Sequence, residues 1–187
     1  MTAESPFRKQ MVVSAAFLMA AATACGGLGA DETAAPDQPS VSPSPAPTGA
    51  VSYRGLPVAD LAIAKQDQVK IKMVVDIAET DQARQTGLMK VPRMADDYGM
   101  AFLFKGPVQV GFHMKDTLIP LDIAFWDESM KIVDTFEMPP CKKQPCPVFL
   151  PKSSYVGAVE MNSGLLQENG AGNGDQVTLT RRVPADP

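Results

Sequence analysis

The chain has 187 residues, a hydrophobic content of 45% and a formal net charge of −4. This length accommodates one domain of ordinary size with extensions, and the acidic balance excludes the basic surface typical of nucleic-acid-binding proteins. One histidine and three cysteines without a C-x-x-C pair exclude a zinc site of clustered Cys and His, so we expect no metal and no cofactor.

The first 24 residues have the organisation of a bacterial signal peptide. Arg8 and Lys9 are followed by an apolar segment, residues 11–22, that is too short for a comfortable membrane span. The small residues leading to Cys25 resemble a lipobox, although Ala22 replaces the usual large aliphatic residue. We therefore expect a lipidated Cys25 that holds the protein on the outer face of a bacterial membrane. The alternative is ordinary signal-peptidase cleavage and a secreted protein.

Residues 25–55 have the composition of a linker. Ala, Pro, Ser, Thr and Gly dominate, and the alternating prolines of residues 42–47 favour an extended, semi-rigid spacer. Such a tract contains too few large apolar groups to fold. We expect a disordered linker over residues 25–55 and one folded domain over residues 56–183.

Alternating apolar and polar residues, and short apolar runs between turn signals, predict a series of short strands. The expected strands are Leu56–Ile63, Val69–Asp76, Gly99–Phe104, Val108–Lys115, Leu121–Trp126, Lys131–Phe136, Tyr155–Met161 and Gln176–Thr180. Thr80 suits the N-cap of a short helix from Asp81 to about Met89, and a second short helix is expected over residues 163–168. This pattern predicts a mainly β domain, either a compact β-sandwich or a partly open barrel, with one or two short helices.

The only histidine of the sequence lies in the strand predicted before the bend at Thr117–Pro120. His113 and Lys115 share one face of that strand, and Asp122 lies opposite the large apolar residues of the next strand. If the two strands pair, an acid, a base and an ammonium group meet on one wall, as in a binding or catalytic site. The competing interpretation is a solvated outer face with a weak ion pair.

Cys141 and Cys146 lie in a proline-rich loop, where regular structure is excluded. Outside the cytoplasm this pair is expected to form a disulfide, and lipidation of Cys25 would leave an even number of cysteines. A reactive or metal-binding thiol pair is the alternative, which an oxidising compartment disfavours.

A further set of residues recurs in a known family. The set comprises Glu79, Arg84, Gly87-Leu88-Met89, Gly99-Met100-Ala101-Phe102, the run Phe112–Phe125, Tyr155, Glu160 and Gly164. Together these residues resemble the bacterial "domain of unknown function 192" family over about residues 69–180, and the central run is the most specific part. The resemblance implies a small, mainly β, sandwich-like domain and no established catalytic activity.

Two positions depart from the pattern of that family. The family commonly has Trp where this chain has His113, and Asn where it has Asp116. A Trp suggests packing or stacking, which weakens His113 as a shared general acid or base. Lys115, Thr117 and Asp122 match the pattern and are the better candidates for a common role.

The expected function is that of an extracytoplasmic, lipid-anchored accessory module that binds a ligand or partner. Polar groups among apolar ones can fix the orientation of a small polar ligand. The expected partners are the membrane, through the lipid, and a small polar ligand or an envelope component, but no nucleic acid. The candidate binding residues are Arg84, Met89, Lys115, Thr117, Asp122 and Glu160.

Two other functions remain open at this point. An envelope-polymer hydrolase would use Asp122 and Glu160 as acid and base, if a cleft holds the two carboxylates at the separation found in glycosidases. Methionine thioethers would suit Cu(I), although most methionines of the domain occupy strand positions at which core packing alone would place them.

Overall fold

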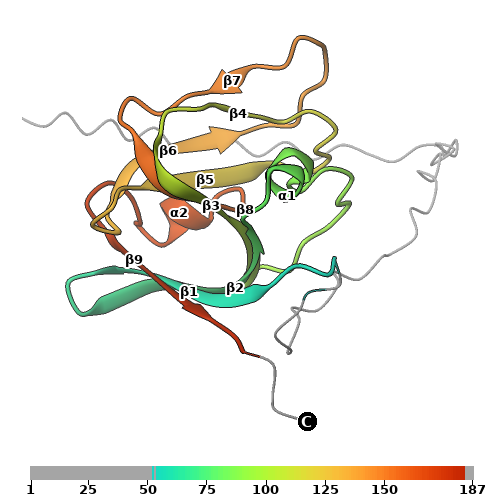
Figure 1. Cartoon of the computed structure of the whole chain (residues 1–187). Coiled ribbons are helices and arrows are strands. Elements are labelled where there is room, and N and C mark those ends of the chain that lie inside the picture. Colours follow the sequence, from blue (N-terminus) through green and yellow to red (C-terminus); the bar gives the residue numbers. More distant parts are fainter. Residues whose placement is uncertain (1–51, 53, 184–187) are drawn as a thin grey trace, which may run out of the picture. The chain divides into compact units, whose positions relative to one another are not determined.

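The computed structural model describes residue 52 and residues 54–183 (Figure 1). The expected signal peptide, the lipidation site Cys25 and most of the expected linker lie outside the described residues. Within the described part of the chain, no helix is long and apolar enough to cross a membrane.

The described residues form a mainly β domain, as predicted. In chain order its elements are β1 (Val58–Lys65), β2 (Gln68–Ala78), α1 (Asp81–Thr86), β3 (Tyr98–Val108), β4 (Phe112–His113), β5 (Leu121–Trp126), β6 (Ile132–Met138), β7 (Val148–Phe149), β8 (Tyr155–Asn162), α2 (Leu165–Glu168) and β9 (Gln176–Arg181). Seven strands form one sheet in the order β6-β5-β8-β3-β2-β1-β9, and β4 pairs with β7 in a second, two-stranded sheet. Strands β2 and β3 run parallel, and α1 lies in the connection between them.

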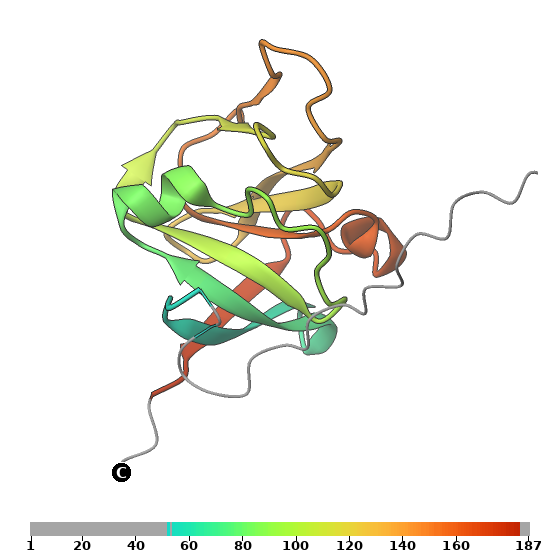
Figure 2. The same ribbon diagram turned by 90° about the vertical axis from the view of Figure 1, so that its right-hand side faces the viewer.

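The seven-stranded sheet curls, and its two edges approach each other at one corner (Figures 1 and 2). An isolated bridge pairs Lys131, just before β6, with Gln176 of β9. Next to it, Ile132 N donates to Asp175 O at 2.9 Å. The sheet is therefore a partly open barrel, which is one of the two architectures predicted for the domain.

Each face of the sheet carries its own hydrophobic core, because both faces are covered. The first core includes Leu61, Ile63, Trp126 and Val159, with Leu166 of α2 packed against them. The second core, on the opposite face of β3, β5 and β8, lies beneath α1 and the β4–β7 sheet; its members include Met100, Phe102, Ile123, Phe125 and Tyr155.

The methionines that suggested copper handling are divided between these two cores. Met73 and Met161 pack in the first core, whereas Met100 and Met114 pack in the second. This is the distribution that core packing produces. The copper interpretation is therefore wrong for these strand methionines.

The predicted strand Val108–Lys115 is also wrong in most of its length. The register of β3 against β8 shifts between Leu103 and Val108, and the chain leaves the large sheet after Val108, which still pairs with Tyr155. Extended pairing resumes only at β4, whose partner is β7 and not β5. Gly111 permits the close approach of these segments, since a Cβ at this position would lie 2.3 Å from Cγ1 of Val148.

A disulfide between Cys141 and Cys146 closes the connection between β6 and β7. The two cysteines were expected to pair from their place in the proline-rich loop. Cys141 packs against the second core. The bond thus restricts the loop that carries β7 back over the sheet, where β7 pairs with β4.

Candidate ligand-binding site

Helix α1 is short because both of its ends are fixed by local chemistry. Thr80 Oγ1 accepts a hydrogen bond from Ala83 N at 3.1 Å, which is an N-cap. Gly87 ends the helix with a φ of 47°, a backbone conformation that favours glycine. The helix therefore ends three residues before Met89, where the sequence pattern placed its end, and the turn after it forms one wall of a cavity.

Arg84 projects from α1, and its guanidinium is held by several neighbours. Nη1 donates to Glu79 O at 2.7 Å and to Leu103 O at 2.8 Å, and Nη2 forms an ion pair with Asp81. Cζ also lies 5.1 Å from the centroid of the Phe104 ring, which is a cation–π arrangement. Arg84 is therefore a fixed positive group whose charge Asp81 already balances.

The opposite wall comes from β4 and the residues beside it. Phe112 packs edge-on against Phe102, with ring centroids 4.9 Å apart, and against Phe125, with centroids 5.5 Å apart. The turn after α1 is tied to the bend after β4, since Lys90 N donates to Asp116 O at 2.8 Å. The two walls are thus joined at one end.

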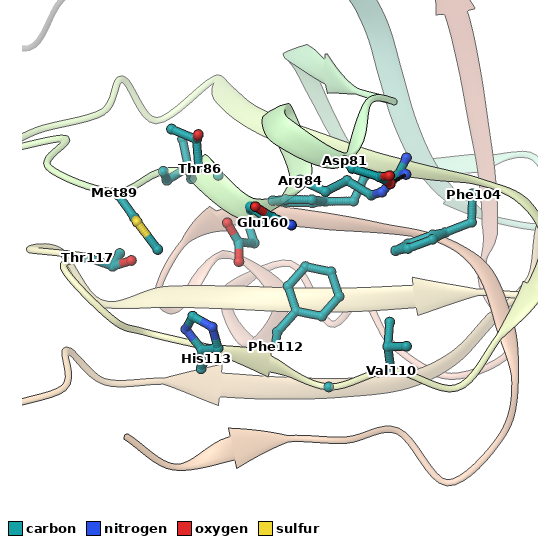
Figure 3. Close-up of a pocket in the computed structure, with 15 residues that line it drawn as sticks. Asp81, Arg84, Thr86, Met89, Phe104, Val110, Phe112, His113, Thr117 and Glu160 are labelled. Atoms are coloured by element: carbon teal, nitrogen blue, oxygen red, sulfur yellow. Dashed lines mark hydrogen bonds and ion pairs between the residues drawn. The ribbon is translucent and has the colours of Figure 1, made fainter. Parts of the chain in front are cut away.

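Between these walls lies a cavity of about 420 Å³ (Figure 3). Its volume is within the range of small-molecule sites. Figure 3 shows Glu160, His113 and Phe112 pointing into the same space. The aromatic lining residues are Phe102, Phe104, Phe112 and His113, and the other polar ones are Asp81, Arg84, Gln85, Thr86, Thr117 and Glu160.

Glu160 is the buried acid of this cavity. It lies on β8 between Met100 of β3 and Ile123 of β5, so its side chain emerges from the apolar centre of the sheet. It is 6% exposed, and no residue in the described part of the chain donates a hydrogen bond to it or forms an ion pair with it. Burial raises the pKa of Glu160 from its ordinary 4.5 to about 8, because desolvation penalises the charged form.

Four of the six candidate binding residues line this cavity: Arg84, Met89, Thr117 and Glu160. His113, which the family comparison made a weaker candidate, also lines it. The cavity thus gathers residues from α1, the turn after it, the bend after β4, and β8. The turn after α1, the bend after β4 and β8 are far apart in the sequence.

The other two candidates, Lys115 and Asp122, are not part of this cavity. Lys115 is exposed and does not line the cavity. The wall of His113, Lys115 and Asp122 does not form, since β4 pairs with β7 and β5 lies between β6 and β8.

Asp122 has a structural role on the opposite face of the sheet. It lies opposite Met161 in the register of β5 against β8, whereas Glu160 lies opposite Ile123. Adjacent positions along a strand point to opposite faces, so the carboxylates of Asp122 and Glu160 are separated by the sheet. The hydrolase that would use them as acid and base is therefore wrong.

The carboxylate of Asp122 instead organises the start of α2. Its Oδ2 accepts hydrogen bonds from Gly164 N and Leu166 N, both at 3.0 Å. Asp122 is buried and the two amide groups need acceptors, so the carboxylate replaces water at this turn.

Several lining residues were missed by sequence reasoning. Phe102 and Phe104 were assigned to a buried strand, and Asp81 to the first turn of a helix. Their period-two spacing is a signal that Phe102 and Phe104 share one face, but nothing in the pattern indicates that this face is partly open. The cavity is open because β4 lies apart from the large sheet, and β4 had been predicted as part of a longer strand.

The profile of the DUF192 family, described as "Uncharacterized ACR", matches residues 62–179. No curated protein matches the sequence.

The solved structures that resemble this fold include the following two proteins. A protein of unknown function from Novosphingobium aromaticivorans DSM 12444 is 25% identical, with a TM-score of 0.64, and the match covers 71% of this chain and 94% of the other. A protein described as a proposed transcription regulator from Sinorhizobium meliloti 1021 is 23% identical, with a TM-score of 0.61, covering 66% and 95%. The second likeness concerns the fold alone.

Proposed function

The chain belongs to the DUF192 family, described as uncharacterized, and we propose that its domain binds a small amphipathic molecule in the cavity between α1 and β4. The domain is further proposed to act outside the cytoplasm, attached to a membrane through Cys25. Its role is that of a ligand-binding accessory module.

The observation that carries this proposal is the unpartnered carboxyl group of Glu160 inside an aromatic cavity. An ionised carboxyl group in such apolar surroundings is unfavourable without a hydrogen-bond partner, and proteins ordinarily pair such groups. Glu160 is 6% exposed, yet the space in front of it is open enough for a small molecule. A ligand that inserts a polar group there would supply the missing partner.

The remaining lining suits the apolar part of such a ligand. The rings of Phe102, Phe104 and Phe112 offer apolar surface, and Arg84 and Thr117 offer polar groups near the ends of the cavity. Small-molecule sites commonly combine an apolar lining with a few placed polar groups.

The proposed location rests on the sequence and on one structural feature. The n-region, the apolar segment and the small residues before Cys25 support export and lipidation. The disulfide between Cys141 and Cys146 is a bond that persists in oxidising compartments. Both features favour the outer face of a bacterial membrane.

Binding in the cavity can be tested by NMR on the purified full chain. The backbone amide resonances would be followed while mixtures of small aromatic amines, alcohols, carboxylates and monosaccharides are added. At least one compound is expected to shift resonances of the cavity residues, including Gly87, Phe112 and Glu160.

A pair of matched variants shows whether the shifts report the cavity. Val110 lines the cavity and is 48% exposed, whereas Val69 lies on β2, away from the cavity lining, and is 47% exposed. Val110→Trp is expected to abolish the shifts by filling the opening, and Val69→Trp is expected to leave them unchanged. If no compound perturbs the cavity resonances, the proposed binding function is wrong.

A further inference from the structure

The charges that line the cavity are unbalanced when Glu160 is ionised. Arg84 is paired with Asp81, so their charges cancel. When Glu160 is ionised, its negative charge has no counter-charge among the described residues. The missing charge is positive, and the net charge of −4 over the whole chain also favours cations over anions at longer range.

The walls next to Glu160 favour the same kind of ligand. Phe102 and Phe112 meet at 89° with their centroids 4.9 Å apart. Aromatic faces carry negative partial charge and attract ammonium groups. The ring of Phe104 already holds the guanidinium of Arg84 at 5.1 Å, so a cation–π contact is an arrangement that this lining accommodates.

From this charge and geometry we infer that the cavity selects a ligand with a protonated amine on an apolar body, the ammonium group contacting Glu160 and the body lying among Phe102 and Phe112. This inference rests on the proposed binding function and adds the chemical class of the ligand. An anionic ligand would be repelled by an ionised Glu160, and the positive charge of Arg84 is already balanced by Asp81.

Binding of an ammonium group is coupled to the proton of Glu160. The pKa of Glu160 is about 8 in the free protein, so the group is mostly protonated at pH 7 and mostly ionised at pH 9. The other ionisable groups that line the cavity are Asp81, Arg84 and His113, and Asp76 lies in the same register row beyond Met100. An ammonium ligand favours the carboxylate and therefore displaces the proton.

The test compares three compounds with one skeleton on the full chain: 2-phenylethylamine, 2-phenylethanol and phenylacetate. Isothermal titration calorimetry would give the Kd at pH 7, 8 and 9, where an alkylamine keeps most of its charge because such amines titrate near 10. The affinity for the amine is expected to rise about tenfold from pH 7 to pH 9, since the ionised fraction of Glu160 rises by that factor. The alcohol and the carboxylate are expected to bind more weakly than the amine at pH 9.

Two Glu→Gln variants supply the matched comparison. Glu160→Gln is expected to lose at least tenfold in affinity for the amine at pH 9 and to lose the pH dependence. Glu128→Gln makes the same change in an exposed turn between β5 and β6 and is expected to behave like the unaltered chain. Circular dichroism of both variants would confirm that they are folded.

The outcomes separate this inference from the proposed function. If the alcohol binds as tightly as the amine at pH 9, or if Glu160→Gln keeps the affinity, the amine inference is overturned. If the cavity responds to other compounds but not to the amine, the ligand class is wrong while the binding function stands. If nothing binds in the cavity, both are wrong.

Discussion

Glu160 is the central residue of the proposed binding site. Its position was recognised in the sequence, where it lies between Val159 and Met161, but neither its burial nor its lack of a partner could be read there. Both follow from the register that places it between Met100 and Ile123. A carboxyl group in such surroundings lowers the stability of the folded chain whenever it is ionised.

We predict that Glu160→Gln removes a pH-dependent loss of stability. The unfolded chain releases the Glu160 proton near pH 4.5, whereas the folded chain holds it to about pH 8. Between these values the folded state binds more protons, so the free energy of unfolding falls as the pH rises. The variant is expected to be more stable than the unaltered chain above pH 8, by at most about 5 kcal/mol, and similar to it near pH 4.5. Urea unfolding at a series of pH values would measure this.

The effect of Glu160 on stability must be separated from that of Asp76, a second buried acid whose pKa is raised. Burial raises the pKa of Asp76, and the hydrogen bond from the Tyr98 hydroxyl opposes that rise. Asp76 is present in both proteins, so the difference between them belongs to Glu160. Parallel stability curves for the two proteins from pH 5 to pH 9 would show that Glu160 is not a perturbed group.

At the scale of single elements, the buried strands were predictable and the β4–β7 sheet was not. The apolar run Gly99–Phe104 and the alternation in Val69–Asp76 lie within β3 and β2. The pairing of β4 with β7 joins segments separated by more than thirty residues, and each strand has two residues. A strand of two residues is too short to show an alternation of apolar and polar residues. The loop closed by the disulfide brings its partner strand, β7, beside it.

Asp122, whose carboxylate lies at the start of α2, was wrongly predicted as a binding residue because strand pairing cannot be read from the sequence. Asp122 matches the family pattern and was therefore a binding candidate. The pattern is equally compatible with its structural role, because the carboxylate at that position accepts hydrogen bonds from Gly164 N and Leu166 N. Which role applies depends on the face of the sheet, and that face is set by pairing with β8.

We predict that Asp122→Ala destabilises the fold without affecting the cavity. The change leaves two amide groups at the start of α2 without their acceptor, at a cost of about 2–4 kcal/mol in the free energy of unfolding. Urea unfolding would measure the loss, with Glu128→Ala, a truncation in an exposed turn, as the control. Loss of ligand binding in a folded Asp122→Ala protein would contradict the assignment of Asp122 to structure.

At the scale of the whole molecule, composition and strand patterning were sufficient for the fold class. The many short strands and two short helices identified a mainly β domain, and the partly open barrel was one of two forms expected. The curl of the sheet depends on contacts between its two edges, such as Lys131 with Gln176, and these pairings leave no pattern in the sequence.

For the whole chain, we predict attachment to a membrane through a lipid on Cys25. Expressed in a bacterium that processes lipoproteins, the chain is expected to appear in the membrane fraction with a lipidated Cys25, identified by mass spectrometry of the mature N-terminus. Cys25→Ser is expected to lose the lipid, whereas the double variant Cys141→Ser/Cys146→Ser keeps it. A mature N-terminus without lipid on Cys25 would support ordinary cleavage and secretion instead.

The most direct test of the binding site is the titration of the Glu160 carboxyl group. Its ¹³C resonance, assigned by its absence in Glu160→Gln, would be followed against pH in the free protein and with saturating 2-phenylethylamine. We predict a pKa of about 8 in the free protein and a fall of one pH unit or more with the amine bound. A pKa near the ordinary 4.5 in the free protein, or a value that the amine leaves unchanged, would contradict this prediction.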